Sequence, residues 1–298
     1  MQVYDEMKTG TQFKVSELCV LKLKMAYDSS KRSVVMPVID TNDWLMDFYQ
    51  LPIELCKKMK PLFPGVSSKD ILDYFRMHGM YQKSSLSGHE IVRTMKRNHI
   101  WSIADQEYKA LKKKWKGPDV PIVILPSNTE SQKLMNETKG KAGLAFSDKL
   151  ILFVPPAISE HELKALLIHE YNHVCRLWHL QKDEQMFTLL DSIILEGLAE
   201  HAVRERLGKA FLSSWTNFHS DEKIQLIWKN DIYPGRKLIR SHPIHNQLLY
   251  GWNGYPKMAG YCVGYYLVEH YLQENKVGTV DILGKEAEVI ASLSSSEN

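Results

Sequence analysis

The chain has 298 residues, 44% of them hydrophobic and 24% charged, a balance typical of a folded protein with a sizeable core. Seven tryptophans and 14 tyrosines argue against disorder, and no apolar run approaches the roughly 20 residues that span a bilayer, so we expect no membrane segment. The net charge of +3 is too small to indicate nucleic acid, and we expect no nucleic-acid partner.

Charge and cysteine usage add two expectations. Residues 1–150 carry 24 basic against 17 acidic side chains, and we interpret their lysine-rich run at residues 112–116 as a solvated helix face. The cysteines form no CxxC pair, which favours reduced thiols; they are Cys19, Cys56, Cys175 and Cys262. Residues 1–14 are polar and show no secretory signal, so we expect a cytoplasmic protein.

The first part of the chain is predicted to be helical. Residues 41–116 have helical patterning, with Thr41 and Ser68 as N-cap candidates. A long helical stretch is expected from about His89 until Gly117 and Pro118 end it. We therefore predict a mainly helical N-terminal region over residues 1–117.

Short apolar segments follow, and they predict strands. Residues 121–126 form an apolar run bounded by prolines. Residues 143–146 and 150–154 flank a Ser-Asp-Lys turn, which is the pattern of a β-hairpin.

Three further helices are predicted after the hairpin. Ser159 opens the first, with Glu162 completing a capping box, and this helix extends to about residue 181. The others are expected at about residues 189–207, where Gly208 ends the helix, and at about 257–273. The resulting fold class is α+β, with a second domain over residues 118–298.

The first of these helices carries the sequence His-Glu-Tyr-Asn-His at residues 169–173. His169 and His173 are four residues apart, so their imidazoles lie on one helix face and can bind one ion. Glu170 lies about 100° round the helix, from where its carboxylate can reach a water on the metal without binding the metal itself. This HExxH arrangement predicts two metal ligands and a general base.

The next helix supplies a third ligand. Glu196 and Glu200 share one face of a largely apolar segment, and the small residues Gly197 and Ala199 allow another helix to approach closely. A catalytic zinc site needs three protein ligands and one open position, and we assign the third ligand to Glu196. Glu200 is expected to hydrogen-bond a ligating histidine, although the reverse assignment of the two glutamates stays open.

Two alternatives compete with this interpretation. Two histidines can simply occupy the polar face of a helix, but the apolar surroundings make unpaired polar groups costly here. Glu170 and His173 also match half of a di-iron carboxylate site, but that site needs a second Glu-x-x-His on another helix, and this sequence has none.

The motif with its downstream glutamates resembles the gluzincin metallopeptidases, of which thermolysin is a member. It resembles more closely a bacterial family of predicted zinc-dependent proteases, the YjaZ-like family, over about residues 120–275. The resemblance implies a zincin-like catalytic domain, one Zn²⁺ per chain and a peptide or protein substrate. It also implies that residues 143–146 form an edge strand that binds extended peptide.

Several tyrosine, cysteine and histidine residues outside the motif have either a chemical role or a role in packing as possible interpretations. Tyr261, with Tyr265 one turn later, is a candidate phenol donor to the tetrahedral intermediate, against the alternative of core packing. Cys175 is expected in the core and His201 on a helix surface. His242 and His245 flank a proline and are expected in a loop.

The sequence therefore predicts a zinc metallopeptidase in which Glu170 is the general base and Tyr261 a further catalytic residue. The alternative is a helical binding or regulatory protein with a structural or inactive metal site, and an intact Glu170 argues against it because structural zinc needs no base. Other metal-dependent amide or ester hydrolases complete the possibilities. The oligomeric state is left undetermined.

Overall fold

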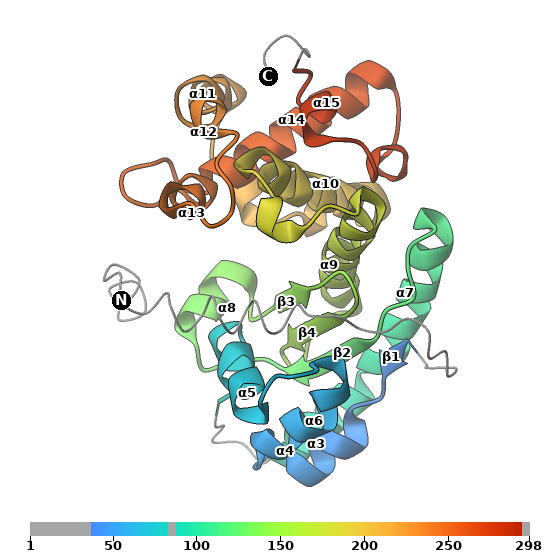
Figure 1. Ribbon diagram of the computed structural model, residues 1–298. Helices are drawn as coiled ribbons and strands as arrows, with labels where there is room; N and C mark the ends of the chain where they lie inside the picture. Colours follow the sequence, from blue (N-terminus) through green and yellow to red (C-terminus); the bar gives the residue numbers. More distant parts are fainter. Residues whose placement is uncertain (1–36, 83–87, 294–298) are drawn as a thin grey trace. The chain divides into compact units, whose positions relative to one another are not determined.

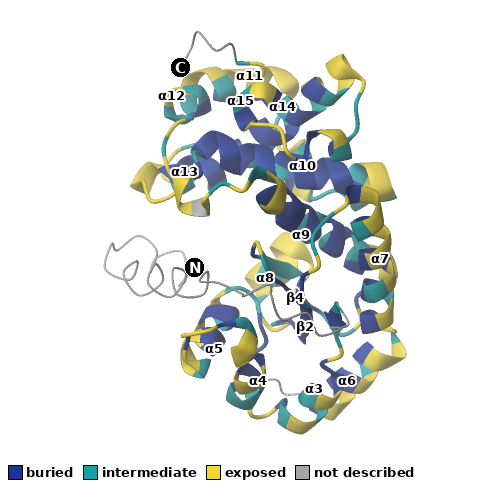
Figure 2. Ribbon diagram, turned by 45° about the vertical axis from the view of Figure 1, so that its right-hand side comes forward, coloured by how far each residue is buried: buried dark blue, intermediate teal, exposed yellow. Residues whose placement is uncertain are grey.

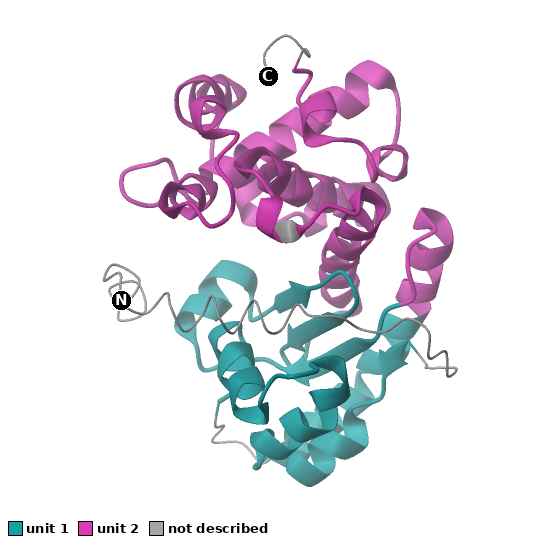
Figure 3. Cartoon of the chain, in the orientation of Figure 1, with its two compact units in different colours: residues 1–105, 120–159 teal, residues 106–119, 160–298 magenta. Residues whose placement is uncertain are grey.

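The computed structural model describes residues 37–82 and 88–293. Cys19 and the polar segment at residues 1–14 lie outside these residues. The described chain forms two compact units, and each is considered by itself (Figure 3). Unit 1 comprises residues 1–105 and 120–159, and unit 2 comprises residues 106–119 and 160–298. No helix among the described residues is long and apolar enough to cross a membrane.

Unit 1 contains a four-stranded mixed sheet and the N-terminal helices (Figure 1). The strands lie in the order β1-β2-β4-β3, with β1, β2 and β4 parallel and β3 antiparallel to β4. They are β1 Val38–Ile39, β2 Ile122–Pro126, β3 Ala142–Ala145 and β4 Leu150–Val154. The helices are α3 Asn42–Phe48, α4 Pro52–Met59, η1 Lys60–Leu62, α5 Ser68–Met77, α6 Gly88–Arg97 and α8 Gln132–Thr138.

The sheet is held to these helices by side chains of its two central strands. Every residue of β2 and β4 is buried, as expected when both faces of a sheet are covered. Phe75 of α5 packs edge-on against Phe153 of β4, with ring centroids 5.4 Å apart. The predicted hairpin is confirmed, and β3 lies at the edge of the sheet.

The N-terminal prediction needs two corrections and one qualification. Ser67, not Ser68, caps α5, because its hydroxyl accepts the backbone N–H of Asp70. Thr41 occupies the N-cap position of α3 as predicted, but its side chain makes no capping bond and donates to the carbonyl oxygen of Ile124. The long helix is broken at His99, whose φ of 53° is left-handed, into α6 and α7 (Ile100–Trp115).

Unit 2 is helical. Its elements are α9 Glu160–Leu180, η2 Glu184–Met186, α10 Leu189–Leu207, η3 Lys209–Phe211, η4 Ser214–Asn217, α11 Asp221–Ile227, η5 Trp228–Ile232, α12 Tyr233–Gly235, α13 Pro243–Tyr250, α14 Ala259–Asn275, η6 Thr279–Ile282 and α15 Ala287–Ile290. The sheet groups with the N-terminal helices and not with this unit. The predicted domain boundary between residues 117 and 118 stays a prediction, since it concerns which part folds alone.

The centre of unit 2 is α10, which packs against both α9 and α14 (Figure 2). Of its 19 residues 14 are buried, which is typical of a helix enclosed on most sides. Thr188 and Asp191 form a capping box at its start, and Gly208 ends it with a φ of 89°. Its predicted bounds are confirmed.

Glycines bring α14 unusually close to α10. A Cβ atom added to Gly264 would lie 1.8 Å from the backbone oxygen of Ile193, and one added to Gly197 would lie 2.3 Å from the backbone of Gly264. Only residues without a side chain fit at such a crossing. This contact places the first turns of α14 beside the middle of α10.

Candidate metal centre

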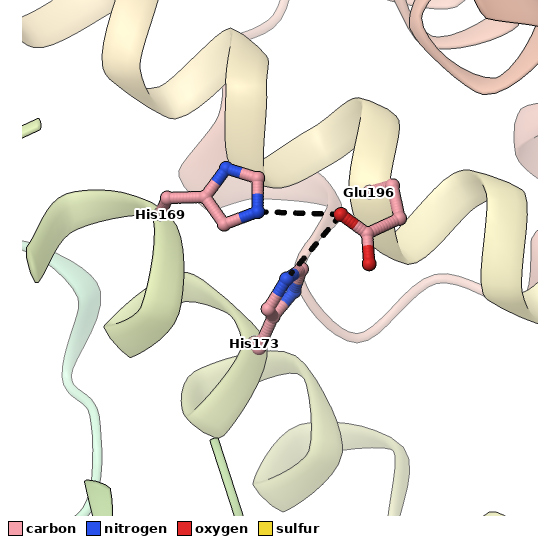
Figure 4. Close-up of side chains that lie close together, drawn as sticks. All are labelled: His169, His173 and Glu196. Atoms are coloured by element: carbon pink, nitrogen blue, oxygen red, sulfur yellow. Dashed lines mark hydrogen bonds and ion pairs between the residues drawn. The ribbon is translucent and has the colours of Figure 1, made fainter. Parts of the chain in front are cut away.

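Helix α9 presents the two motif histidines side by side. His169 and His173 are one helical turn apart, and their ring centroids lie 4.6 Å apart with the rings nearly perpendicular. Both Nε2 atoms point towards α10 (Figure 4). The spacing in the sequence therefore produces the pair of converging nitrogen atoms that it predicted.

Glu196 of α10 meets both histidines with one oxygen atom. Its Oε2 lies 3.3 Å from Nε2 of His169 and 3.6 Å from Nε2 of His173 (Figure 4). Two ligands bound to zinc at about 2.0–2.1 Å and at a tetrahedral angle are about 3.3–3.4 Å apart. The three side chains are thus spaced to hold a zinc ion, and they form a candidate His-His-Glu metal site.

Glu200 lies one turn beyond Glu196, on the other side of the His169 ring. Its Oε2 is 3.0 Å from Nδ1 of His169, and its other oxygen accepts the backbone N–H of Ser213. A carboxylate at Nδ1 makes that nitrogen the donor and leaves the Nε2 lone pair for a metal. Glu200 therefore connects a candidate ligand to the segment that follows α10.

The ionisable side chains of the site shift the pKa values of one another. Burial lowers the pKa of His169, but hydrogen bonds with Glu196 and Glu200 outweigh burial and raise that pKa well above its ordinary value. Burial raises the pKa of Glu196, but the interactions with the two histidines outweigh burial and leave that pKa well below its ordinary value. Without metal, His169 and Glu196 thus form an ion pair, and a bound cation would replace the imidazole proton.

Glu170 is on α9 next to the histidines and is partly exposed. Burial raises the pKa of its carboxyl group, the neighbouring histidines oppose this rise, and the Glu196 carboxylate adds to it. A carboxylate with a raised pKa is better matched to accepting a proton near neutral pH. Its position and its environment are both suited to a base.

Tyr261, in the first turn of α14, lies beside Glu196. Its ring centroid lies 5.7 Å from that of Tyr250, which ends α13. Burial, together with the charge of Glu196, raises the pKa of Tyr261 well above its ordinary value, so the phenol is protonated. The close crossing of α10 and α14 is what brings this residue to the site.

Sequence reasoning misplaced two histidines and did not anticipate that Tyr250 lies beside Tyr261. Tyr250 ends α13 and carried no motif that would have marked it. His201 is buried, not at the surface: its ring stacks on Tyr265 at 4.0 Å, and its Nε2 donates to the Tyr265 carbonyl oxygen. His245 lies in α13 and not in a loop, buried beside Ser192 with 3.1 Å between Nε2 and Oγ. Contacts between helices far apart in sequence decide all three.

Two other side chains of α9 lie away from the site, and the predicted place of Cys175 in the core is confirmed. The hydroxyl of Tyr171 donates to the carbonyl oxygen of Pro118, away from the histidine face. Cys175 is fully buried, and burial raises the pKa of its thiol to about 12, which makes it a poor ligand. Neither residue takes part in the site.

Comparison with known proteins agrees with this geometry. A family model described as "Predicted Zn-dependent protease (DUF2268)" matches residues 100–292. The chain is 40% identical to the uncharacterized protein YjaZ of Bacillus subtilis (strain 168) over 256 residues, covering 85% of this chain and 97% of the relative. It is 24% identical over 146 residues to the uncharacterized protein YjfC of the same organism, covering 46% of this chain and 49% of that relative. No solved structure matches.

Proposed function

Because this chain belongs to the DUF2268 family of predicted Zn-dependent proteases, we propose that it is a zinc metallopeptidase of the gluzincin type. His169, His173 and Glu196 would hold one zinc ion per chain. The observation that carries the proposal is the single Glu196 oxygen placed 3.3 and 3.6 Å from two imidazole nitrogens. Three protein ligands leave one position open, as a catalytic zinc site requires.

The remaining side chains of the site support hydrolysis in complementary ways. Zinc, when bound, would act as a Lewis acid on the scissile carbonyl group and on the attacking water. Glu170 would accept the proton of that water and return it to the leaving amine. Glu200 would hold His169 in the tautomer that binds metal. A phenol beside Glu196, for which the sequence indicated Tyr261, would donate to the oxyanion.

The expected substrate is a peptide or protein. The family description supports this class, and β3 lies at the edge of the sheet that the described residues form, a position where a strand can pair with an extended chain. Peptide binding by β3 remains a prediction from the resemblance. If a variant with a shortened β3 kept its activity on peptides, that result would contradict the prediction.

A metal-dependent cleavage assay tests the function directly. Purified protein would be offered a peptide library with zinc, after removal of zinc by a chelator, and after zinc is added back. Glu170→Gln is the matched control, because it keeps the shape and the zinc ligands but removes the base. We expect cleavage only with zinc and a loss of about 10²–10⁴ in kcat for Glu170→Gln. A Glu170→Gln variant with zinc bound and normal turnover would exclude this mechanism.

A further inference from the structure

The buried carboxylate of Glu200 is held on both sides. One of its oxygens lies 3.0 Å from Nδ1 of His169, and the other accepts the backbone N–H of Ser213. An ionised carboxylate has only acceptors, so each of its buried oxygens needs a donor. The imidazole supplies one donor, and the chain that follows α10 supplies the other. Ser213 is thus the second partner of the group that orients a candidate zinc ligand.

The donor at Ser213 determines which way the carboxylate faces. Without it, one oxygen of a buried charged group would have no partner, which is costly. The carboxylate would then turn towards the donors that remain, and its bond with Nδ1 of His169 would weaken. Because that bond makes Nδ1 the donor and leaves Nε2 for the metal, the Ser213 N–H acts on a candidate ligand through two hydrogen bonds.

Contacts with two other helices fix the short segment between α10 and α11 that carries this donor. The ring of Phe211 stacks on that of His161 in α9, with centroids 5.0 Å apart. The backbone oxygen of Trp215 accepts the thiol proton of Cys262 in α14, with 3.1 Å between oxygen and sulfur. The N–H of Ser213 is therefore presented by a segment whose position is set by α9 and α14, and not by α10 alone.

The backbone at this place fits proline. Ser213 has a φ of −63° and a ψ of 143°, and Leu212 before it has a φ of −67° and a ψ of 149°. Proline fixes φ near −65°, has no N–H and needs an extended residue before it. The carbonyl oxygen of Ser213, which accepts from Thr216, would be kept. Proline at this position therefore removes the donor and leaves the path of the chain unchanged.

We propose that Ser213 is a positioning residue of the metal centre, whose backbone N–H sets the zinc affinity through Glu200 and His169. This role rests on the zinc site of the proposed function, but not on which bond the enzyme cleaves. The N–H holds the carboxylate, the carboxylate holds the imidazole, and the imidazole presents Nε2 to the ion. The segment after α10 is therefore part of the metal centre, although it contributes no ligand.

A double-mutant cycle tests the proposal, with zinc affinity measured in competition with a chelator. Ser213→Pro should weaken zinc binding about 10-fold, the lower end of the usual effect of removing a group that holds a ligand. In a Glu200→Ala background the same substitution should change the affinity by less than about twofold, because no carboxylate remains for the N–H to hold. An equal loss in both backgrounds would overturn the proposal, since proline would then act only by disturbing the fold.

Two matched controls separate the N–H from the side chain and from proline itself. Ser213→Ala removes the hydroxyl group and keeps the N–H. Ser214→Pro places proline at the first position of η4, where proline is favoured, after the extended residue Ser213. Both variants should bind zinc like the wild type. A loss in either control as large as that in Ser213→Pro would overturn the proposal.

A spectroscopic measurement tests the same contact without metal. In metal-free protein with isotope-labelled histidine, the Nδ1 proton of His169 should resonate downfield and exchange slowly with water, because a carboxylate accepts it. Ser213→Pro should move this resonance upfield and speed its exchange, and an unchanged resonance would overturn the proposal. If the wild type binds no zinc, the proposed function fails, while this resonance still decides whether Ser213 orients Glu200 and His169.

Discussion

A histidine lies at each of the two main contacts of helix α10, and its surroundings shift the imidazole pKa in opposite directions at the two contacts. Towards α9, His169 lies between two carboxylates, those of Glu196 and Glu200. Towards α14, His201 stacks on an aromatic ring and donates to a backbone carbonyl oxygen. The pKa of His169 is raised well above its ordinary value, whereas burial lowers that of His201 to about 4.

The difference shows what distinguishes a metal site from ordinary burial of histidine. A lone imidazole inside a protein is kept neutral by one acceptor and by packing. Converging carboxylates instead provide negative charge. In the absence of metal a proton on the imidazole balances this charge, and a bound divalent cation can take the place of that proton. The α9–α10 contact is therefore a candidate site, and the α10–α14 contact is a structural support that positions Tyr261.

The largest expected effect distinguishes the two contacts by metal content. His173→Ala should lose the single zinc ion, because two remaining ligands cannot hold it tightly, while His201→Ala should keep it. Elemental analysis after expression with added zinc measures both variants. Equal loss of zinc from the two variants would show that the α9–α10 face has no special role.

A second prediction concerns the close approach of α14 to α10. Gly264→Ala should lower the free energy of unfolding by at least about 3 kcal/mol, the upper end for overpacking, because the added carbon meets backbone that cannot turn aside. Gly284→Ala is the control, since its added carbon would lie 3.6 Å from the Cβ atom of His179, an ordinary contact. Denaturant unfolding compares them, and equal stability would mean that the helices can separate freely.

A third prediction uses pH to examine His201 alone. The unfolded chain binds a proton at this residue below about pH 6.5, whereas the folded protein resists protonation until about pH 4. Stability should therefore fall as pH decreases from 6.5 to 4, by about 3 kcal/mol in total from this group. Metal-free His201→Gln should show a shallower decline than the metal-free wild type. Parallel stability curves would contradict the lowered pKa.

The smallest expected effect is on the group behind His169. Glu200→Ala should weaken zinc affinity about 10–100-fold without abolishing it, since its carboxylate holds a candidate ligand and does not bind the metal. Glu205→Ala is a suitable control on the same helix, because that carboxylate accepts hydrogen bonds from Thr279. If Glu200→Ala lost zinc completely while Glu196→Ala kept it, the roles of the two glutamates would be exchanged.

Local sequence patterns were sufficient to predict the parts of the site that depend on helix geometry. Two histidines four residues apart on a helix must share a face, and so must Glu196 and Glu200. Patterning and capping residues also placed α10 and the β3–β4 hairpin correctly. These features follow from the side-chain periodicity of helices and strands. That periodicity can be recognised within a single segment, without knowing which other segments pack against it.

The side chains that surround the site could not be predicted in this way, because they are brought together by packing. The burial of His201, the place of Tyr250 beside Tyr261 and the grouping of the sheet with the N-terminal helices all depend on contacts between distant segments. The glycines are visible in the sequence as small residues, but the sequence around Gly197 does not indicate that it would contact Gly264. Periodicity shows which face of a helix is apolar, and only packing selects the helix that covers it.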